Sequence, residues 1–118
     1  MGTYSHVAVV SANERLIYVS GQVALDENGS LIGKGDAARQ AEQVFENIRR
    51  ILTDCGASVT DIVKINWYFR NMADRAAILP ARDRFLGAHR PASTAVEVSR
   101  LVNDDWLVEV DCVAAIRG

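Results

Sequence analysis

Two adjacent hydroxyl side chains stand at the start of a strand-like segment. Residues 91–98 read PASTAVEV, so that Ser93 and Thr94 lie between a proline and an alternation of apolar and polar residues. Hydroxyl groups donate and accept hydrogen bonds, and threonine is common in strands. The pair has two interpretations: ordinary strand chemistry, or a binding site for a small molecule that has lost its charged side chain.

The other residue types that carry chemistry are dispersed along the chain. Cys55 and Cys112 are far apart and lack metal-binding spacing, and each continues an apolar pattern that is typical of reduced core cysteines. His6 and His89 are isolated, so a metal site would need further ligands for which the sequence shows no pattern. We therefore expect no metal, and we interpret both histidines as solvated or locally hydrogen-bonded side chains.

Composition and charge limit the classes of function. The chain has 118 residues, 49% hydrophobic and 24% charged, which is typical of one domain spanning residues 1–118. Its formal net charge is -2, whereas a non-specific nucleic-acid binder normally carries a basic excess. The N-terminal sequence lacks a signal-peptide pattern, and no apolar run reaches membrane-spanning length. We therefore expect a cytoplasmic protein that binds neither nucleic acid nor membranes.

The first third of the chain has a strand-like pattern. Residues 6–10 and 15–19 are β-rich and are separated by a turn-like segment, which predicts a hairpin. The Asn28–Gly29 pair that follows suits a tight type I′ turn, so a further short strand pair is expected around it.

Two segments have the apolar period of a helix. Residues 36–55 form one continuous apolar face, with Asp36 suited to cap the start and Gly56 suited to the left-handed conformation after the end. A second helix is predicted over residues 74–88. Because an interior proline costs about 3 kcal/mol, we expect an irregular first turn and regular helix from Pro80 onward.

Three further strands are predicted over residues 61–70, 93–99 and 106–116. One sheet with two helices on one face is the simplest solution for this order of elements, so the predicted class is α+β. The other face of the sheet mixes polar and apolar side chains, namely Ile62, Tyr68, Leu107, Glu109, Asp111 and Val113. A half-apolar face of this size is most simply buried against copies of the same chain, which predicts a homo-oligomer.

Six segments carry a family resemblance that covers almost the whole chain. They are YSH at 4–6, YVSGQVALD at 18–26, GDAARQAEQVFENIRRILTDCGAS at 35–58, DIVKINWYFRNMAD at 61–74, RPASTAVEVSRL at 90–101 and VEVDCVA at 108–114. In this order and without large gaps they resemble the Rid family, also called the RidA or YjgF family and, under an older name, endoribonuclease L-PSP.

The resemblance implies a chorismate-mutase-like fold, a mixed sheet backed by two helices, assembled as a homotrimer with intersubunit clefts. Many members of the family hydrolyse reactive enamines and imines, such as 2-aminoacrylate, to keto acids and ammonia without a metal or organic cofactor. In such members an arginine grips the substrate carboxylate, and a glutamate on the last strand positions the water. We therefore expect a small-molecule ligand in an intersubunit cleft, and no cofactor.

The sequence departs from this family pattern where the substrate would bind. Ser93 takes the position of the carboxylate-binding arginine, Thr94 matches the next hydroxyl, and Ala95 replaces a common cysteine. Asp111 replaces the glutamate, and Leu79 takes the position of an asparagine. Neutral hydroxyl hydrogen bonds are worth about 1 kcal/mol, roughly half of a charged one, so we expect little 2-aminoacrylate deaminase activity. Replacing Ser93 with arginine is expected to restore carboxylate capture.

The resemblance also assigns site roles. Asp111 is the predicted catalytic residue, because its short side chain would hold a water for addition to the substrate. The predicted substrate-binding residues are Tyr4, Ser20, Gly21, Gln22, Ser93, Thr94 and Ala95. The predicted function is water addition to small reactive imine, enamine or carbonyl metabolites. The alternative is a non-catalytic trimer that binds a small ligand or a protein partner. A ribonuclease is disfavoured by the charge and by the lack of a paired histidine or lysine constellation.

Several side chains keep a structural interpretation beside the functional one. Asp111 would then pair at an interface with an arginine of a neighbouring subunit, such as Arg100. Glu97 is interpreted as structural, and Trp67 and Tyr68 are interpreted as packing residues. Whether Arg90 replaces the missing clamp is left open by the sequence.

Overall fold

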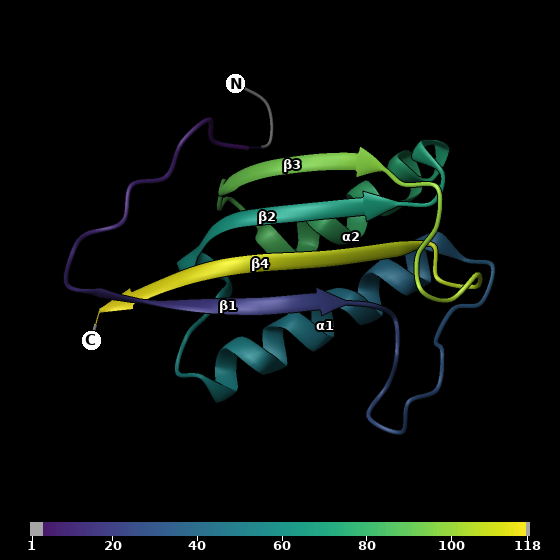
Figure 1. Cartoon of the computed structure of the whole chain (residues 1–118), viewed down its shortest axis with the longest axis horizontal. Coiled ribbons are helices and arrows are strands. Elements are labelled where there is room, and N and C mark those ends of the chain that lie inside the picture. The colour runs from purple at the N-terminus through teal and green to yellow at the C-terminus, as the bar shows by residue number, and fades with distance from the viewer. Residues whose placement is uncertain (1–3, 118) are drawn as a thin grey trace.

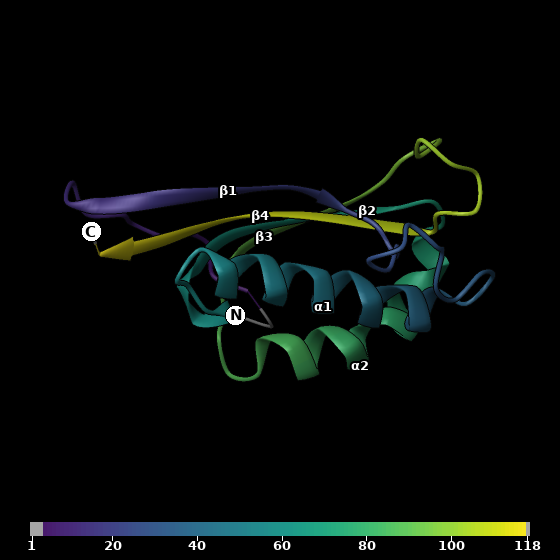
Figure 2. The same ribbon diagram turned by 90° about the horizontal axis from the view of Figure 1, so that it is seen from below.

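One mixed sheet with both helices on a single face makes up the computed structural model, which describes residues 4–117 (Figures 1 and 2). The elements are β1 (Glu14–Gln22), α1 (Ala37–Asp54), β2 (Ile62–Phe69), α2 (Arg75–Leu86), β3 (Ala92–Glu97) and β4 (Val108–Arg117). The strand order is β1-β4-β2-β3, with β2 and β3 parallel and the other neighbours antiparallel. The predicted α+β class is confirmed. We call the sheet face opposite the helices the open face.

Helix α1 forms where the sequence predicts it. The Asp36 carboxylate accepts a hydrogen bond from the backbone N–H of Arg39 at 3.0 Å, which satisfies one of the free donors of the first turn. Gly56 has a φ of +79°, the left-handed conformation that ends many helices. The side chains that α1 buries against the sheet and α2 include Ala41, Val44, Phe45, Ile48 and Leu52.

Helix α2 differs from its prediction. A 3₁₀ turn, Met72–Asp74, leads directly into regular helix from Arg75, so that Pro80 lies inside the helix. Proline has no N–H to donate to the carbonyl of Ala76. Both Ala76 and Pro80 are exposed, so water can hydrogen-bond to that carbonyl instead. The expectation that regular helix begins at Pro80 is therefore wrong.

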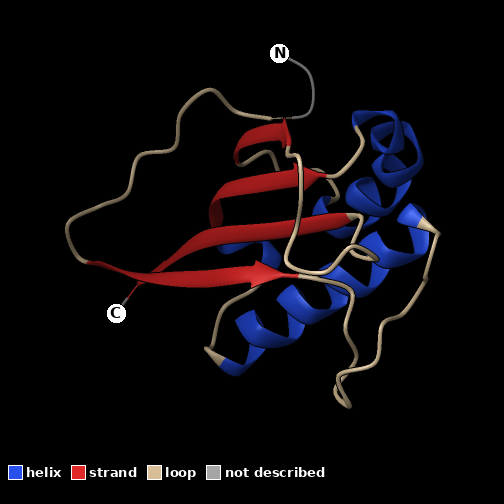
Figure 3. Ribbon diagram, turned by 45° about the vertical axis from the view of Figure 1, so that its right-hand side comes forward, coloured by secondary structure: helices blue, strands red, loops and turns tan. Residues whose placement is uncertain are grey.

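The predicted N-terminal hairpin is also wrong. Residues 6–10 run as an extended segment outside the sheet, and β1 pairs with β4 instead (Figures 1 and 3). The backbone N–H of Ser5 bonds to the carbonyl of Pro91 at 3.0 Å, beside β3. This contact draws the segment to the opposite edge of the sheet, away from β1. A β-rich sequence pairs only where tertiary structure offers it an edge.

The turn at Asn28–Gly29 is not of type I′. Within residues 4–117 positive φ values occur only at glycines, whereas a type I′ turn needs one at Asn28 as well. The Asp26 carboxylate instead accepts from the N–H groups of Asn28 and Ser30, both at 2.9 Å. The expected strand pair around the turn is reduced to one isolated bridge, between Leu25 and Leu31.

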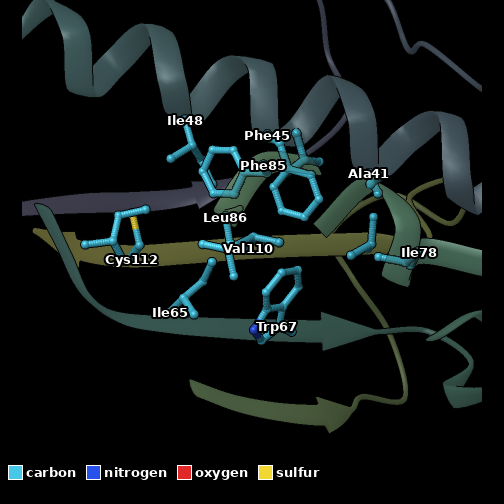
Figure 4. Close-up of a cluster of buried hydrophobic side chains, with 14 of the residues drawn as sticks. Ala41, Phe45, Ile48, Ile65, Trp67, Ile78, Phe85, Leu86, Val110 and Cys112 are labelled. Atoms are coloured by element: carbon cyan, nitrogen blue, oxygen red, sulfur yellow. The ribbon is translucent and has the colours of Figure 1, made fainter. Parts of the chain in front are cut away.

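The hydrophobic core lies between the sheet and the two helices (Figure 4). Phe45 of α1 stacks on Phe85 of α2 with ring centroids 4.6 Å apart, and it meets Trp67 of β2 edge-on at 5.4 Å. Ile62 also belongs to this core, because the register of β2 against β4 shifts between Ile62 and Lys64. The prediction that Ile62 lies on the open face is therefore wrong.

A buried glutamine joins α1 to two loops. The Nε2 group of Gln40 donates to the carbonyls of Gly33 (3.1 Å) and Asp105 (3.0 Å), and its Oε1 accepts from the N–H of Leu107 (2.9 Å). Gln40 has no exposed surface, and these bonds satisfy both ends of its buried amide. This side chain holds the start of β4 in place against α1.

Candidate functional site

A small pocket lies between α2 and β3 on the helix-covered face. Its volume is about 260 Å³, at the small end of the range for ligand sites. We call it the α2–β3 pocket. It is lined by Tyr4, Trp67, Phe69, Arg75, Ile78, Leu79, Arg82, Ser93 and Ala95. The pocket thus contains three of the predicted substrate-binding residues, Tyr4, Ser93 and Ala95.

Strand alternation aims Ser93 into this pocket. Ser93 is the register partner of Ile65, and Ala95 is the partner of Trp67, so both share the face of these buried residues. The Nε1 group of Trp67 donates to Ser93 Oγ at 2.8 Å. Ser93 therefore satisfies the indole of a buried tryptophan, and its own hydroxyl proton is still available to a ligand. Trp67 is a packing residue, as predicted.

Thr94 faces the other side of the sheet. It is the register partner of Asn66, and Lys64 Nζ donates to Thr94 Oγ1 at 2.6 Å. Successive side chains of a strand point to opposite faces, so Ser93 and Thr94 do not act together within one chain.

Asp111 lies on the open face, at the centre of a polar group. Its Oδ1 accepts from Nδ2 of Asn66 at 2.7 Å, and its Oδ2 accepts from the hydroxyl of Tyr68 at 2.9 Å. Glu109 lies on the same face, two residues before Asp111 on β4. We call Asn66, Tyr68, Glu109 and Asp111 the Asp111 cluster. Tyr68 is thus more than a packing residue, because it orients the predicted catalytic carboxylate.

Burial and the carboxylate of Asp111 raise the pKa values of three groups in or beside the Asp111 cluster. The hydrogen bond to Asp111 raises the pKa of Tyr68, with a further contribution from desolvation, so its hydroxyl stays a donor at neutral pH. Burial raises the pKa of Glu109, and the charge of Asp111 adds to the rise. Burial, together with the charge of Asp111, also raises the pKa of the Cys112 thiol to about 12, so Cys112 is no nucleophile.

Three of the predicted substrate-binding residues, Ser20, Gly21 and Gln22, lie on β1, the outer strand opposite β3. The register of β1 shifts between Val19 and Gln22, and Gln22 Nε2 donates to the carbonyl of Ser20 at 3.1 Å. A Cβ atom on Gly21 would lie 1.9 Å from Glu109 Oε2, so glycine leaves room for that carboxylate. Because β1 and β3 are the outer strands of the sheet, roughly 14 Å separates them.

One chain therefore does not bring the predicted site residues together. Ser93 lies in the α2–β3 pocket, Asp111 and Thr94 lie on the open face, and the segment 20–22 lies at the opposite edge. The predicted site lies in a cleft between subunits, and it stays a prediction because one chain alone does not form it. The physical reason is the sheet itself, which keeps alternate residues of a strand on opposite sides.

Other candidates take structural positions. Arg90 Nη1 donates to the carbonyls of Gly87 (2.7 Å) and His89 (2.9 Å), and Arg90 is not among the residues that line the α2–β3 pocket in the described part of the chain. Arg100 pairs with Asp104 at 3.4 Å within the same chain. Glu97 Oε1 accepts from the N–H of Met72 at 2.8 Å, a structural contact as predicted.

The sequence pattern does not single out two arginines that line the pocket, Arg75 and Arg82. They are seven residues apart on α2, which is close to two helical turns and places both on one face. That spacing is the signal that points to them once residues 75–86 are known to be helical.

Within residues 4–117 no group of three or more His, Cys, Asp or Glu side chains is placed to hold a metal ion. Of the helices formed by the same residues, none is long and apolar enough to cross a membrane.

Comparison with known proteins gives consistent matches over most of the chain. The family model described as endoribonuclease L-PSP matches residues 1–116. A RutC family protein of Pyrococcus abyssi is 38% identical over 114 residues, which are 97% of this chain and 87% of that protein. The 3-aminoacrylate deaminase RutC of Acinetobacter baylyi is 37% identical over 103 residues, covering 87% of this chain and 81% of that protein. The crystal structure of a Rid family protein of unknown function from Yersinia pestis has a TM-score of 0.86 and 30% identity, covering 97% of this chain and 87% of that one.

Proposed function

Because the chain belongs to the endoribonuclease L-PSP family, now called the Rid family, we propose that it hydrolyses small reactive enamines or imines. The observation that carries this proposal is the α2–β3 pocket, because it is lined by Ser93 and Ala95, two residues to which the resemblance assigns substrate binding. The deaminase name of the Acinetobacter baylyi relative supports an enamine as substrate.

The proposed active unit contains more than one copy of the chain. Asp111 and the α2–β3 pocket lie on opposite sides of one sheet, so a site that uses both needs Asp111 from a second copy. The open face has exposed apolar side chains suited to such contacts, namely Leu16, Tyr18 and Val96. In the described part of the chain this face is free of helices (Figure 2). These features support a homotrimer with intersubunit clefts.

The proposed reaction is water addition to a C=N bond. An enamine first takes a proton on carbon and becomes an iminium ion. Asp111 accepts a proton as the water oxygen attacks the imine carbon, and Asn66 and Tyr68 hold its carboxylate in position. The nitrogen then takes up that proton, and Asp111 accepts the hydroxyl proton as the C–N bond breaks, so that ammonia and a carbonyl compound leave. This hydroxyl proton returns to solvent and replaces the one that the enamine carbon took up. Water supplies the oxygen, so the balance needs no oxidant or reductant.

A turnover assay tests the proposal. Imines are generated from amino acids with an amino-acid oxidase, and semicarbazide traps whatever the protein has not hydrolysed. The wild-type protein is expected to lower semicarbazone formation. Asp111→Asn is expected to lose roughly 100-fold or more, the usual contribution of a general base. The matched control is Asp104→Asn, which removes an exposed carboxylate paired with Arg100 and should leave turnover unchanged. No turnover by the wild-type protein over a panel of imines and 3-aminoacrylate would contradict the proposal.

A second candidate function is ligand binding without catalysis. It is favoured by Ser93, which uses its oxygen to accept from Trp67 and offers a ligand one neutral hydroxyl in place of an arginine fork. The two functions differ in one measurement: a binding protein would bind the product-like keto acid while leaving the imine unhydrolysed.

A further inference from the structure

Two arginines of α2 line the α2–β3 pocket together with Ser93. Arg75 and Arg82 are the charged residues of its lining within residues 4–117, so the pocket carries positive charge without a carboxylate in its wall. Ser93 stands at the position where the resemblance places the carboxylate-binding arginine. The charge that is missing from β3 is therefore present on the helix that closes the same pocket.

Arg82 is held in a defined orientation. Its side chain is only 11% exposed, and its Nε and Nη2 groups donate to Asp83 Oδ1 at 3.2 and 2.8 Å. A guanidinium has five N–H donors, so Nη1 and part of Nη2 are still free for another acceptor. Asp83 is 64% exposed and is not a lining residue of the pocket. It therefore orients Arg82 without occupying the pocket lining.

Arg75 adds a second positive charge to the pocket lining. It is exposed, and within residues 4–117 it forms no ion pair. An exposed arginine can move toward an anion at little structural cost, because its side chain packs in no core. The two arginines differ in exposure and pairing, since Arg82 is largely enclosed and paired with Asp83 whereas Arg75 is exposed.

The rest of the wall describes the ligand. Phe69, Ile78 and Leu79 offer apolar surface, and Ser93 offers a hydroxyl proton. A volume of about 260 Å³ admits a short aliphatic molecule. A carboxylate at one end would meet a planar guanidinium, the pairing that gives two parallel charge-assisted hydrogen bonds.

From these observations we infer that Arg82, assisted by Arg75, forms the carboxylate clamp of this protein and takes over the task of the arginine absent at Ser93. The inference rests on the proposed function in one respect, the placement of the substrate in this pocket. The ligand class is a short aliphatic 2-oxo or 2-imino carboxylate. The charge comes from α2 instead of β3, so the carboxylate approaches from the helix side of the pocket.

Binding of a stable keto acid tests the clamp without any turnover. The probes are 2-oxobutanoate and its uncharged amide, titrated by calorimetry and by amide chemical shifts in NMR. The wild-type protein is expected to bind the carboxylate roughly 10- to 100-fold more tightly than the amide. Arg82→Gln is expected to remove this preference, and Arg75→Gln is expected to reduce it. Arg82→Lys keeps the positive charge but loses the two-pronged guanidinium, so it should retain only part of the preference for the carboxylate.

The matched control is Arg84→Gln. Arg84 lies on the same helix but pairs with Glu42 on α1 and is outside the α2–β3 pocket, so its loss should leave the preference intact. Equal binding of carboxylate and amide by the wild-type protein would overturn the inference. A preference that survives in both Arg82→Gln and Arg75→Gln would overturn it as well. Arg75 is exposed, so its variant tests the clamp even if Arg82→Gln fails to fold.

The two proposals fail in different ways. If imines are hydrolysed but the arginine variants bind and turn over as the wild type does, the clamp is wrong and the hydrolase function stands. If arginine-dependent carboxylate binding is found without hydrolysis of any imine, the clamp stands and the enzyme function is wrong.

Discussion

The two faces of the sheet handle polar groups in different ways. On the covered face, polar side chains are satisfied inside the chain, as when Ser93 accepts from Trp67 or Gln40 bonds to three backbone groups. On the open face, Asp111 and its neighbours bond to one another beside exposed apolar side chains. The covered face is therefore packed against helices of the same chain. The open face is the one that a second copy would cover in the proposed assembly.

The largest expected effect is on the open face. Tyr18 is 74% exposed on β1, so Tyr18→Asp should leave the isolated fold intact. A carboxylate buried between subunits costs several kcal/mol, so the proposed trimer should dissociate. Because Asp111 would then be separated from the neighbouring pocket, turnover should fall at least about 100-fold. Light scattering and the semicarbazide assay measure the two effects.

The control for Tyr18→Asp is Ala88→Asp, which places the same charge at an exposed position after α2, on the helix side of the molecule. It should keep both assembly and turnover. If the wild-type protein is monomeric at micromolar concentration, the proposal that the open face binds a second copy is wrong.

On the covered face the largest effect is on stability. Gln40→Leu removes the hydrogen bonds to the N–H of Leu107 and to the carbonyls of Gly33 and Asp105, and each lost hydrogen bond costs about 1 kcal/mol. We expect the free energy of unfolding to fall by about 3 kcal/mol in urea titrations. Gln43→Leu, which removes a bond only to Asn47, should cost about 1 kcal/mol or less. Equal losses in the free energy of unfolding for the two substitutions would show that the bonds of Gln40 stabilise the fold no more than the single bond of Gln43.

A rescue experiment sharpens the role of the pocket on the covered face. From the sequence, Ser93→Arg is expected to restore carboxylate capture. The structure changes this expectation, because a third arginine beside Arg75 and Arg82 adds like charge, and Trp67 Nε1 loses its acceptor at a cost of about 1 kcal/mol. Ser93→Arg should therefore gain little in the wild-type background. In Arg82→Gln it should restore carboxylate affinity roughly 10-fold, measured by calorimetry. Equal gains in both backgrounds would contradict an α2 clamp.

The smallest effect concerns Glu109 and pH. Its pKa is raised in the folded chain above the ordinary value of 4.5, so the folded state binds this proton more tightly than the unfolded state does. This group therefore favours folding at pH below 4.5, and its contribution is lost as the pH rises through the raised pKa. Glu109→Gln should flatten the fall in stability over that interval, as followed by urea unfolding at a series of pH values. An unchanged pH profile would show that burial on the open face is too slight to matter.

Much of the fold could be predicted because its signals are local. The apolar stripe, the Asp36 cap and Gly56 together predict α1, and alternation predicts β2 and β4. The wrong predictions concern segments whose structure depends on contacts with residues far away in the sequence. Residues 6–10 have strand propensity but lie beside β3 through Ser5, and Ile62 enters the core through a register shift against β4.

The candidate site was predictable in part. The resemblance points to Ser93, Ala95, Tyr4 and Asp111, and the two-residue period of a strand already separates Ser93 from Thr94. The shared position of Arg75, Arg82 and Ser93 in one pocket does not follow from the resemblance or from strand periodicity, because it depends on the tertiary packing that places α2 beside β3.

The sequence by itself determined the family and the helix-covered sheet, since each depends on residue types in a local order. Only the tertiary structure decided that Asp111 and Ser93 lie on opposite sides of the sheet and that α2 brings two arginines to the pocket. Side-chain periodicity places a residue on one face of its own element. Which elements that face meets is decided by long-range packing, in which contacts between distant segments offset the entropy of bringing them together.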